Sequence, residues 1–300
     1  MKKNHTLNRR HFLTVTPALL AVIGISSAFL SASVSGGELA MKNPFFAMDT
    51  GTRDEQHKTP ESQARLLKEL GYAGVGWSPG QVPEMLAALD HEGLRMFNVY
   101  IGVDIDGVNR TAPAPIVKLI EQLRGRDTAL WLYVTSKKHP KPSDESGDED
   151  AVAMLRDIAD RADTAHLKVA LYPHTGFWLE RVQDALRVAR QVDRKNLGVT
   201  FNLCHCLKVG DEARIPELLE QARPFLFFVS INGADHTGNW DRLIQPLGQG
   251  EFDVASVLKT LKKIGYQAPI GLQHYAVKGP VQEKLRQSMD GWRKLAAQAE

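Results

Sequence analysis

Neutral polar side chains able to move protons or bind hydroxyl groups recur in the second half of this sequence. His174 and His205 can exchange protons near neutral pH, as general acid–base catalysis requires. Tyr172 can donate a hydrogen bond to an oxygen that gains negative charge during a reaction. Asn202 and Gln273 each carry an N–H donor and a carbonyl acceptor, a combination suited to the hydroxyl groups of a ligand.

Eight β-type runs alternate with helical patterns after residue 37, and these elements must position the polar residues. One helix begins with Thr59 as N-cap and Pro60 in its first turn and ends at Gly71, a complete start and stop pattern. Strands are expected at residues 44–48, 73–77, 95–101, 129–134, 167–172, 197–201, 225–231 and 269–272. Helices are expected at residues 60–70, 82–91, 116–123, 148–164, 178–192, 215–222, 254–264 and 281–295. Eight such units predict an α/β fold, a (β/α)8 TIM barrel.

Functional residues of such barrels lie in the loops that follow the carboxyl ends of the strands. Besides the five residues above, this rule selects a further set: Asp49, Trp77, Tyr100, Lys137, Asn232 and Tyr275. We expect Trp77 to stack on a ring of the ligand, although packing in the core is the commoner role of such a residue. We expect Asn232 and Lys208 to bind hydroxyl groups of the ligand. Two long loops, residues 137–150 and 233–251, could cover the site, although the acidic run in the first loop favours a solvated surface.

The amino terminus has the pattern of an export signal. Lys2, Lys3, Arg9 and Arg10 precede an interrupted apolar stretch and then small residues, and the string from Asn8 to Leu13 resembles a twin-arginine signal. We therefore expect residues 1–36 to be a cleaved signal peptide and residues 37–300 to form one barrel domain. The mature protein would lie in the periplasm or otherwise outside the cytoplasm, with no stable membrane span.

Charge and cysteine content restrict the classes of partner. Removing the four basic residues of the signal from the 37 Lys and Arg leaves 33 against 35 Asp and Glu, so the barrel lacks the basic excess that nucleic-acid binding needs. Cys204 and Cys206 are too close in the chain for ordinary disulfide geometry. We expect two small buried side chains there. The expected partner is a small molecule, and the sequence does not predict an oligomeric state.

Several motifs resemble the xylose isomerase-like superfamily of TIM barrels, which includes sugar phosphate isomerases and epimerases. The stretch from Gly198 to His205 resembles its sixth-strand motif, which commonly has an aspartate where Asn202 stands. Residues 246–250 and 265–275 resemble its carboxyl-terminal segment, where a glutamate ends strand eight. Residues 170–174 resemble its fifth-strand end, where the family has a glutamate two residues before the histidine.

The resemblance implies a divalent metal site, but the ligand positions are substituted. Family members hold one ion by two glutamates, an aspartate and a histidine, and the matching positions here are Tyr172, Asn202, Gln273 and, more loosely, Ser230. Magnesium and manganese prefer anionic oxygen ligands. We therefore predict no catalytic metal in that arrangement, although a divalent ion such as Mn, Mg or Zn stays open as a cofactor.

A zinc site of three histidines is the competing metal hypothesis. His174, His205 and His274 could gather at the barrel mouth. However, Gln273 and His274 are adjacent in a strand, so their side chains point to opposite faces. If Gln273 faces the barrel interior, His274 does not.

Two functions remain open. The leading hypothesis is an isomerase- or epimerase-like enzyme that acts on a sugar or keto-sugar by histidine-assisted proton transfer, with His205, His174 and Tyr172 as catalytic residues. The alternative is a non-catalytic carbohydrate-binding barrel, since loss of the family's carboxylates is also what drift from catalysis would leave. A DNA-repair endonuclease, which shares this barrel, would need a zinc cluster and a basic surface that the sequence lacks.

Overall fold

The computed structural model describes residues 41–107 and 109–299. The predicted signal peptide, residues 1–36, lies outside the described residues. Within the described part of the chain, no helix combines the length and hydrophobicity of a membrane span.

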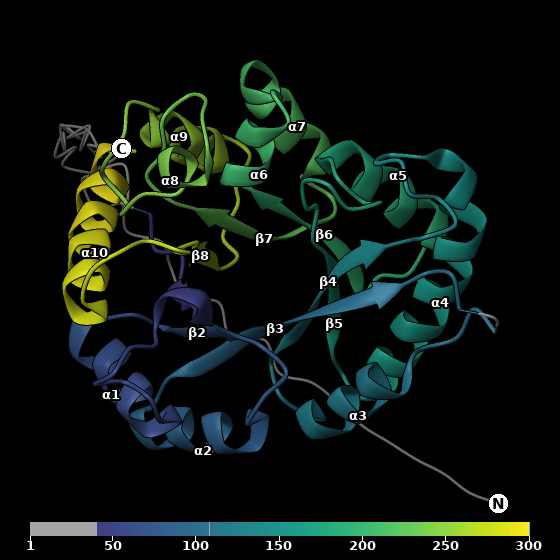
Figure 1. Cartoon of the computed structure of the whole chain (residues 1–300), viewed down its shortest axis with the longest axis horizontal. Coiled ribbons are helices and arrows are strands. Elements are labelled where there is room, and N and C mark those ends of the chain that lie inside the picture. Colours follow the sequence, from purple (N-terminus) through teal and green to yellow (C-terminus); the bar gives the residue numbers. More distant parts are fainter. Residues whose placement is uncertain (1–40, 108, 300) are drawn as a thin grey trace, which may run out of the picture. The chain divides into compact units, whose positions relative to one another are not determined.

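Eight parallel strands close into a barrel in the order in which they occur in the chain (Figure 1). They are β1 (Phe45–Met48), β2 (Gly74–Trp77), β3 (Arg95–Asp104), β4 (Ala129–Thr135), β5 (Lys168–Leu171), β6 (Leu197–Asn202), β7 (Leu226–Ile231) and β8 (Ile270–Leu272). Pairing of β1 with β8, in the register Phe45 with Ile270, closes the ring. The predicted (β/α)8 TIM barrel is confirmed.

Helices surround the barrel, and the last helix packs beside the first (Figure 1). The long helices are α1 (Pro60–Leu70), α2 (Val82–Glu92), α3 (Ala114–Leu123), α4 (Asp148–Thr164), α5 (Val182–Val192), α7 (Ile215–Ala222), α9 (Val254–Lys263) and α10 (Val281–Gln298). Short elements in the loops are η1 (Asp49–Gly51), η2 (Glu145–Gly147), α6 (Leu203–Lys208), η3 (Glu212–Arg214) and α8 (Trp240–Leu243). The Thr59 hydroxyl accepts from the Ser62 amide and Ser62 caps Thr59 in return, which begins α1 as predicted.

Two elements differ from the sequence prediction. Helix α5 begins at Val182 rather than at residue 178, because the Asp184 carboxylate accepts the backbone amides of Glu180 and Arg181 and so caps the helix there. Helix α6 was not predicted, and it carries both Cys204 and Cys206. Both thiols are buried and unpaired, as expected.

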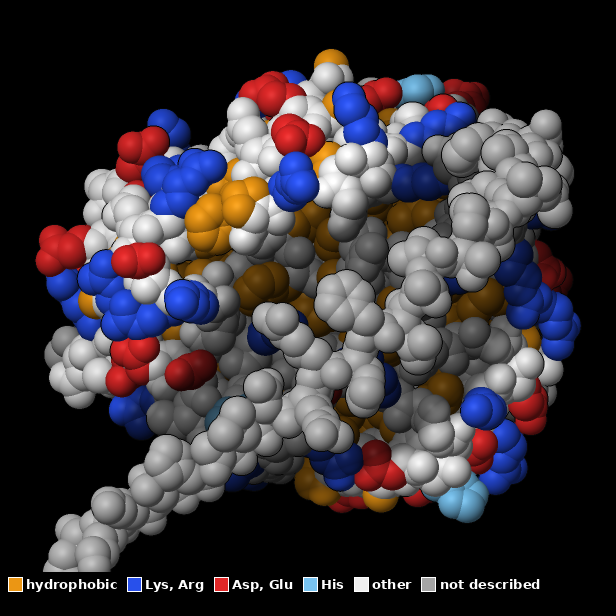
Figure 2. Space-filling model, turned by 180° about the vertical axis from the view of Figure 1, so that it is seen from behind, with side chains coloured by type: hydrophobic (Ala, Val, Ile, Leu, Met, Phe, Trp, Pro, Cys, Tyr) orange, Lys and Arg blue, Asp and Glu red, His pale blue; other side chains and the backbone are white. Residues whose placement is uncertain are grey.

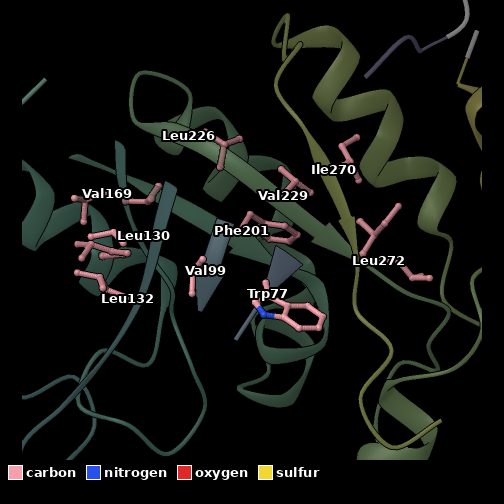
Figure 3. Packing of buried hydrophobic residues seen from close by; sticks show 14 of the residues in the cluster. Trp77, Val99, Leu130, Leu132, Val169, Phe201, Leu226, Val229, Ile270 and Leu272 are labelled. Carbon is pink, nitrogen blue, oxygen red and sulfur yellow. The ribbon is translucent and has the colours of Figure 1, made fainter. Parts of the chain in front are cut away.

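Apolar side chains fill two separate layers. Between strands and helices lies the larger one, to which β2 contributes Trp77 and β3 contributes Val99 (Figure 3). Inside the barrel, Phe46 stacks on Phe97 at 4.8 Å between ring centroids, and the Trp131 ring meets the ring of Phe46 edge-on at 6.1 Å. This aromatic plug closes the barrel interior below Tyr172, whose ring lies 5.1 Å from that of Trp131.

Charged side chains are mixed on the surface. On the face shown in Figure 2, Lys and Arg alternate with Asp and Glu around the periphery. No broad basic area is visible among the coloured side chains of that face.

Candidate functional site

A cavity of about 400 Å³ opens at the carboxyl ends of the strands. Its wall comes from five strands or the segments that directly follow them, β1, β3, β5, β6 and β8, and from the loop that holds α8. The lining residues are Met48, Asp49, Thr50, Tyr100, Tyr172, His174, His205, Trp240, Ile244, Gln273 and Tyr275. Most of these side chains are aromatic or apolar, and none is a lysine or an arginine. This is the position in which barrels of this type bind their ligands.

The Tyr172 hydroxyl lies at the centre of the cavity floor. Its oxygen accepts a hydrogen bond from the side-chain nitrogen of Asn202 at the end of β6. It accepts a second one from the side-chain nitrogen of Gln273 at the end of β8, at 3.3 Å. Since both lone pairs are then engaged, the hydroxyl proton is free to be donated to another oxygen. The expected convergence of Tyr172, Asn202 and Gln273 is therefore observed.

The orientation of the Gln273 amide is fixed by the backbone around it. Its Oε1 accepts the backbone amides of His274 at 2.9 Å and Tyr275 at 3.1 Å. The Thr50 hydroxyl adds a third donor at 3.4 Å. Because backbone amides can only donate, Oε1 must face them and Nε2 must face Tyr172.

Tyr172 remains a neutral phenol in this environment. Burial raises its pKa well above the usual 10, and the nearby thiol of Cys204 and phenol of Tyr100 raise the pKa further. The hydrogen bonds from Gln273 and Asn202 act in the opposite direction and are the smaller effect. Tyr172 can therefore serve as a hydrogen-bond donor and does not provide an anionic oxygen.

Thr175 assigns different proton positions to the two histidines. The Nδ1 of His174 lies 2.9 Å from the Thr175 carbonyl oxygen, which can only accept, so this Nδ1 carries a proton. The Nδ1 of His205 lies 3.3 Å from the Thr175 backbone nitrogen, which can only donate, so that Nδ1 is an acceptor. In the neutral forms, the Nε2 of His174 has a free lone pair and the Nε2 of His205 carries a proton.

Both histidines are held in the neutral form. Burial lowers the pKa of His174, although its hydrogen bond to Thr175 acts in the opposite direction. Burial lowers the pKa of His205 well below 6.5, and the charge on a protonated His174 would lower it further. The rings lie 4.1 Å apart between centroids, and His174 also stacks on Phe177 at 4.0 Å. The wall thus offers a base and a proton donor side by side.

Asp49 is the single carboxylate among the described residues that line the cavity. It begins the turn η1 directly after β1. A Cβ atom on Gly51 would collide with the Cβ of His274, so this glycine lets the turn lie against the end of β8. Burial raises the pKa of Asp49, while hydrogen bonds from Ser78 and the positive charge of Arg53 act to lower it.

Four residues predicted to bind the substrate do not line this cavity. Asn202 is 1% exposed, and its amide donates to the Tyr172 hydroxyl and accepts from the Cys204 thiol. Trp77 is 1% exposed and belongs to the apolar layer outside the barrel, where its indole donates to the carbonyl of Gly80. Asn232 is fully buried, and its amide nitrogen binds the carbonyls of Gly233 and Leu243. Lys208 donates to the Gly238 carbonyl and lies over the ring of Trp240. The predicted roles of Asn202, Trp77 and Asn232 in direct sugar binding are wrong in this structure, and Lys208 contacts Trp240, which lines the cavity.

Trp240 and Thr175 are among the contributors to the site that sequence reasoning missed, together with Met48, Thr50 and Ile244 of the cavity wall. Trp240 comes from the loop of residues 233–251, and its ring meets that of His205 edge-on at 5.4 Å. Thr175 acts mainly through its backbone, which no residue type reveals, and its hydroxyl also lies 3.2 Å from the Nδ1 of His205. Asp49 was selected by the strand-end rule but was not assigned a role.

The histidine pattern bears on the alternative zinc site. His274 points away from the cavity toward α10, where its Nε2 lies 3.3 Å from the Ser288 hydroxyl. This confirms that Gln273 and His274 face opposite sides. Among the residues described, no group of three or more His, Cys, Asp and Glu side chains could hold a metal ion.

The family model described as the xylose isomerase-like TIM barrel matches residues 64–295 of this chain. Two curated relatives also match. The uncharacterized protein MJ1311 of Methanocaldococcus jannaschii is 28% identical over 102 residues, 34% of either chain. The ketose 3-epimerase of Arthrobacter globiformis is 26% identical over 187 residues, 61% of either chain. The chain thus matches about a third and three fifths of the lengths of these relatives.

Solved structures share the fold at low sequence identity. The 3-keto-D-glucoside 4-epimerase of E. coli superposes with a TM-score of 0.68 at 17% identity, covering 84% of this chain and 100% of that one. The IOLI protein, solved with a zinc atom, gives 0.68 at 14% identity, with 86% and 99% covered. The D-psicose 3-epimerase of Clostridium cellulolyticum H10, solved with D-tagatose, gives 0.64 at 16% identity, with 84% and 99% covered.

Proposed function

Because the chain belongs to the xylose isomerase-like TIM barrel family, we propose that it is an epimerase- or isomerase-like enzyme acting on a sugar or keto-sugar without a divalent metal. The curated relative named a ketose 3-epimerase and the epimerases among the similar structures support the substrate class. The observation that carries the proposal is the Tyr172 hydroxyl, held by two amide donors and free to donate into the cavity.

The four positions that match the family's metal ligands do not fit a divalent cation. Tyr172 is a neutral phenol, and Asn202 and Gln273 turn their N–H groups toward it. Their carbonyl oxygens face elsewhere, Asn202 toward the thiol of Cys204 and Gln273 toward backbone amides. Ser230 is fully buried, and its hydroxyl has no hydrogen-bond partner among the described residues. A hard cation needs converging oxygens with negative charge, and this site presents converging N–H donors instead.

Proton transfer next to a carbonyl group needs a base and a donor for the developing oxyanion. In this proposal, the Nε2 of His174 removes the proton from the carbon beside the sugar carbonyl. The electron pair moves onto the carbonyl oxygen, which accepts hydrogen bonds from the Tyr172 hydroxyl and the Nε2–H of His205. Asn202 and Gln273 hold the tyrosine in position, and the rings of Trp240 and Tyr275 offer apolar surface to the sugar.

We expect the enzyme to bind its substrate outside the cytoplasm. The twin-arginine-like segment, residues 1–36, supports this part of the proposal on sequence alone. The balanced charge of the remaining chain supports a small carbohydrate rather than a nucleic acid as partner.

The test is turnover of a panel of keto-sugars followed by proton NMR. D-fructose, D-allulose, D-tagatose and methyl 3-keto-D-glucoside are each incubated with the purified chain, with and without EDTA. We expect epimerisation of at least one sugar at the same rate in EDTA. If EDTA abolishes turnover and manganese or zinc restores it, the metal-free proposal is wrong. If calorimetry detects sugar binding but no sugar is converted, the chain is a carbohydrate-binding barrel and not an enzyme.

A further inference from the structure

We propose that Asp49 is a second proton-transfer residue of this site, placed across the bound sugar from His174, so that the reaction inverts one carbon. This assignment rests on the proposed function and adds the residue that returns the proton. It also selects epimerisation over isomerisation, because an aldose–ketose isomerisation can use one base on one face of the sugar.

The barrel topology places the two residues on opposite walls. His174 follows β5 and Asp49 follows β1, and in a closed barrel of eight strands in sequential order β5 is four strands away from β1 in either direction. Both side chains line the same cavity. A sugar bound between the two walls therefore meets His174 on one face and Asp49 on the other.

The surroundings of Asp49 suit a group that exchanges protons with a ligand. Its backbone carbonyl completes the turn η1 by accepting the Thr52 amide and hydroxyl. The turn is thus completed by the backbone of this residue, and Asp49 is one of the residues that line the cavity. Ser78, at the end of the neighbouring strand β2, hydrogen-bonds the Asp49 carboxyl and restricts its orientation.

The pKa values of the two proposed proton-transfer residues are shifted in opposite directions. Burial raises the pKa of Asp49 and lowers the pKa of His174. Both shifts disfavour the charged form of the residue concerned.

The reaction balances without a redox partner. His174 takes the proton from the carbon beside the carbonyl. The electron pair of the broken C–H bond forms a C=C bond, and the π electron pair of the carbonyl moves to the oxygen that Tyr172 binds. Asp49 then gives its proton to the opposite face of that carbon, and the carbonyl re-forms. The product is the epimer, with His174 protonated and Asp49 ionised, and exchange with solvent resets both groups. The reverse direction uses Asp49 as the base.

Isotope exchange in D₂O distinguishes proton transfer by His174 from proton transfer by Asp49. The variants are Asp49→Asn and His174→Gln, and the matched control is Asp104→Asn, an exposed aspartate at the end of β3 that does not line the cavity. Each is incubated with each epimer of a converted pair, such as D-fructose and D-allulose, and deuterium at the inverted carbon is followed by NMR. Thermal unfolding of each variant verifies that it is folded.

We expect the unaltered chain and Asp104→Asn to form product with one deuterium at the inverted carbon. Epimerisation should fall by about 100-fold or more in both site variants. Asp49→Asn should still exchange deuterium into one epimer only, and His174→Gln into the other epimer only. Normal epimerisation by a folded Asp49→Asn, or loss of exchange from both epimers in that variant, would overturn the assignment of Asp49 alone. Absence of any turnover by the unaltered chain would overturn the proposed function, and this assignment with it.

Discussion

Gln273 donates its side-chain amide to the phenolic oxygen of Tyr172 across 3.3 Å and so connects the end of β8 with the end of β5. These strands lie three positions apart around the closed barrel. Because backbone amides fix the direction of the Gln273 amide, the Tyr172 oxygen accepts from Gln273 and its own proton is left for another acceptor. Catalysis in this account depends on that direction.

Gln273→Glu should abolish this arrangement while preserving shape. A carboxylate at this position has no N–H to donate, so it would accept the Tyr172 proton and turn it away from the ligand. We expect the rate of turnover to fall about 100-fold or more, as when one oxyanion donor is removed. Steady-state kinetics measure the effect, and an unchanged kcat would show that the direction of the hydroxyl proton does not matter.

His205→Ala removes the proton donor that Thr175 fixes at Nε2. We expect kcat to fall between about 10-fold and 1,000-fold, because Tyr172 still supplies one donor to the oxyanion. His236→Ala is the matched control, since His236 is an exposed histidine that pairs with Glu212 and does not line the cavity. Equal turnover by the two variants would remove His205 from the mechanism.

The free energy of unfolding should fall as the pH drops below about 6.5. The folded-state pKa values of His174 and His205 are lowered by burial, and that of His274 is lowered to about 3. Below pH 6.5 the unfolded chain therefore takes up protons that the folded chain does not bind. Each histidine adds up to about 1.4 kcal/mol per pH unit to the slope. The raised pKa of Asp49 acts in the opposite direction, but only above pH 3.8 and below its folded pKa.

Urea unfolding between pH 7 and pH 4 measures this slope, and His274→Gln isolates one contribution. His274 lies outside the cavity, so this variant should show a shallower slope without changing the groups that line the site. A slope identical to that of the unaltered chain would show that His274 is not held neutral by burial.

Gly291→Ala should destabilise the barrel, although alanine ordinarily favours a helix interior over glycine by about 1 kcal/mol. Gly291 lies on the buried side of α10, and a Cβ atom there would collide with the backbone carbonyl of Leu247. Overpacking of this kind costs about 1 to 3 kcal/mol. Gln287→Ala on the exposed side of α10 is the control, and it should leave the Tm unchanged or slightly raised. A higher Tm for Gly291→Ala would contradict the predicted collision.

The barrel could be predicted from the sequence because each βα unit carries its own local pattern. The N-cap of α1 at Thr59 and the alternation of apolar runs are properties of neighbouring residues. The beginning of α5 was less accessible, because Asp184 caps it only once the preceding turn is folded. The short helix α6 directly follows a strand and leaves no separate periodic pattern.

The candidate site was partly predictable for the same reason. Strand ends brought Tyr172, Asn202 and Gln273 to one floor because parallel strands end at one edge of a barrel. The prediction that Trp77 stacks on the ligand was wrong because side chains alternate along a strand. Trp77 shares the outward face of β2 with Val75. The prediction that Asn232 binds the ligand was wrong because the chain turns after β7, and the side-chain amide of Asn232 donates to loop carbonyls there. Loop conformation also decided the roles of Thr175 and Trp240, which local sequence does not specify.

Turnover by Tyr172→Phe, measured in EDTA, tests most directly whether the Tyr172 hydroxyl stabilises the negative charge that develops on the carbonyl oxygen. The substitution removes one oxygen and keeps the ring that packs on Trp131. The account predicts a fall in kcat of about 100- to 1,000-fold, with KM changed no more than a few-fold and no response of either protein to EDTA. A folded Tyr172→Phe variant with the kcat of the unaltered chain would contradict it.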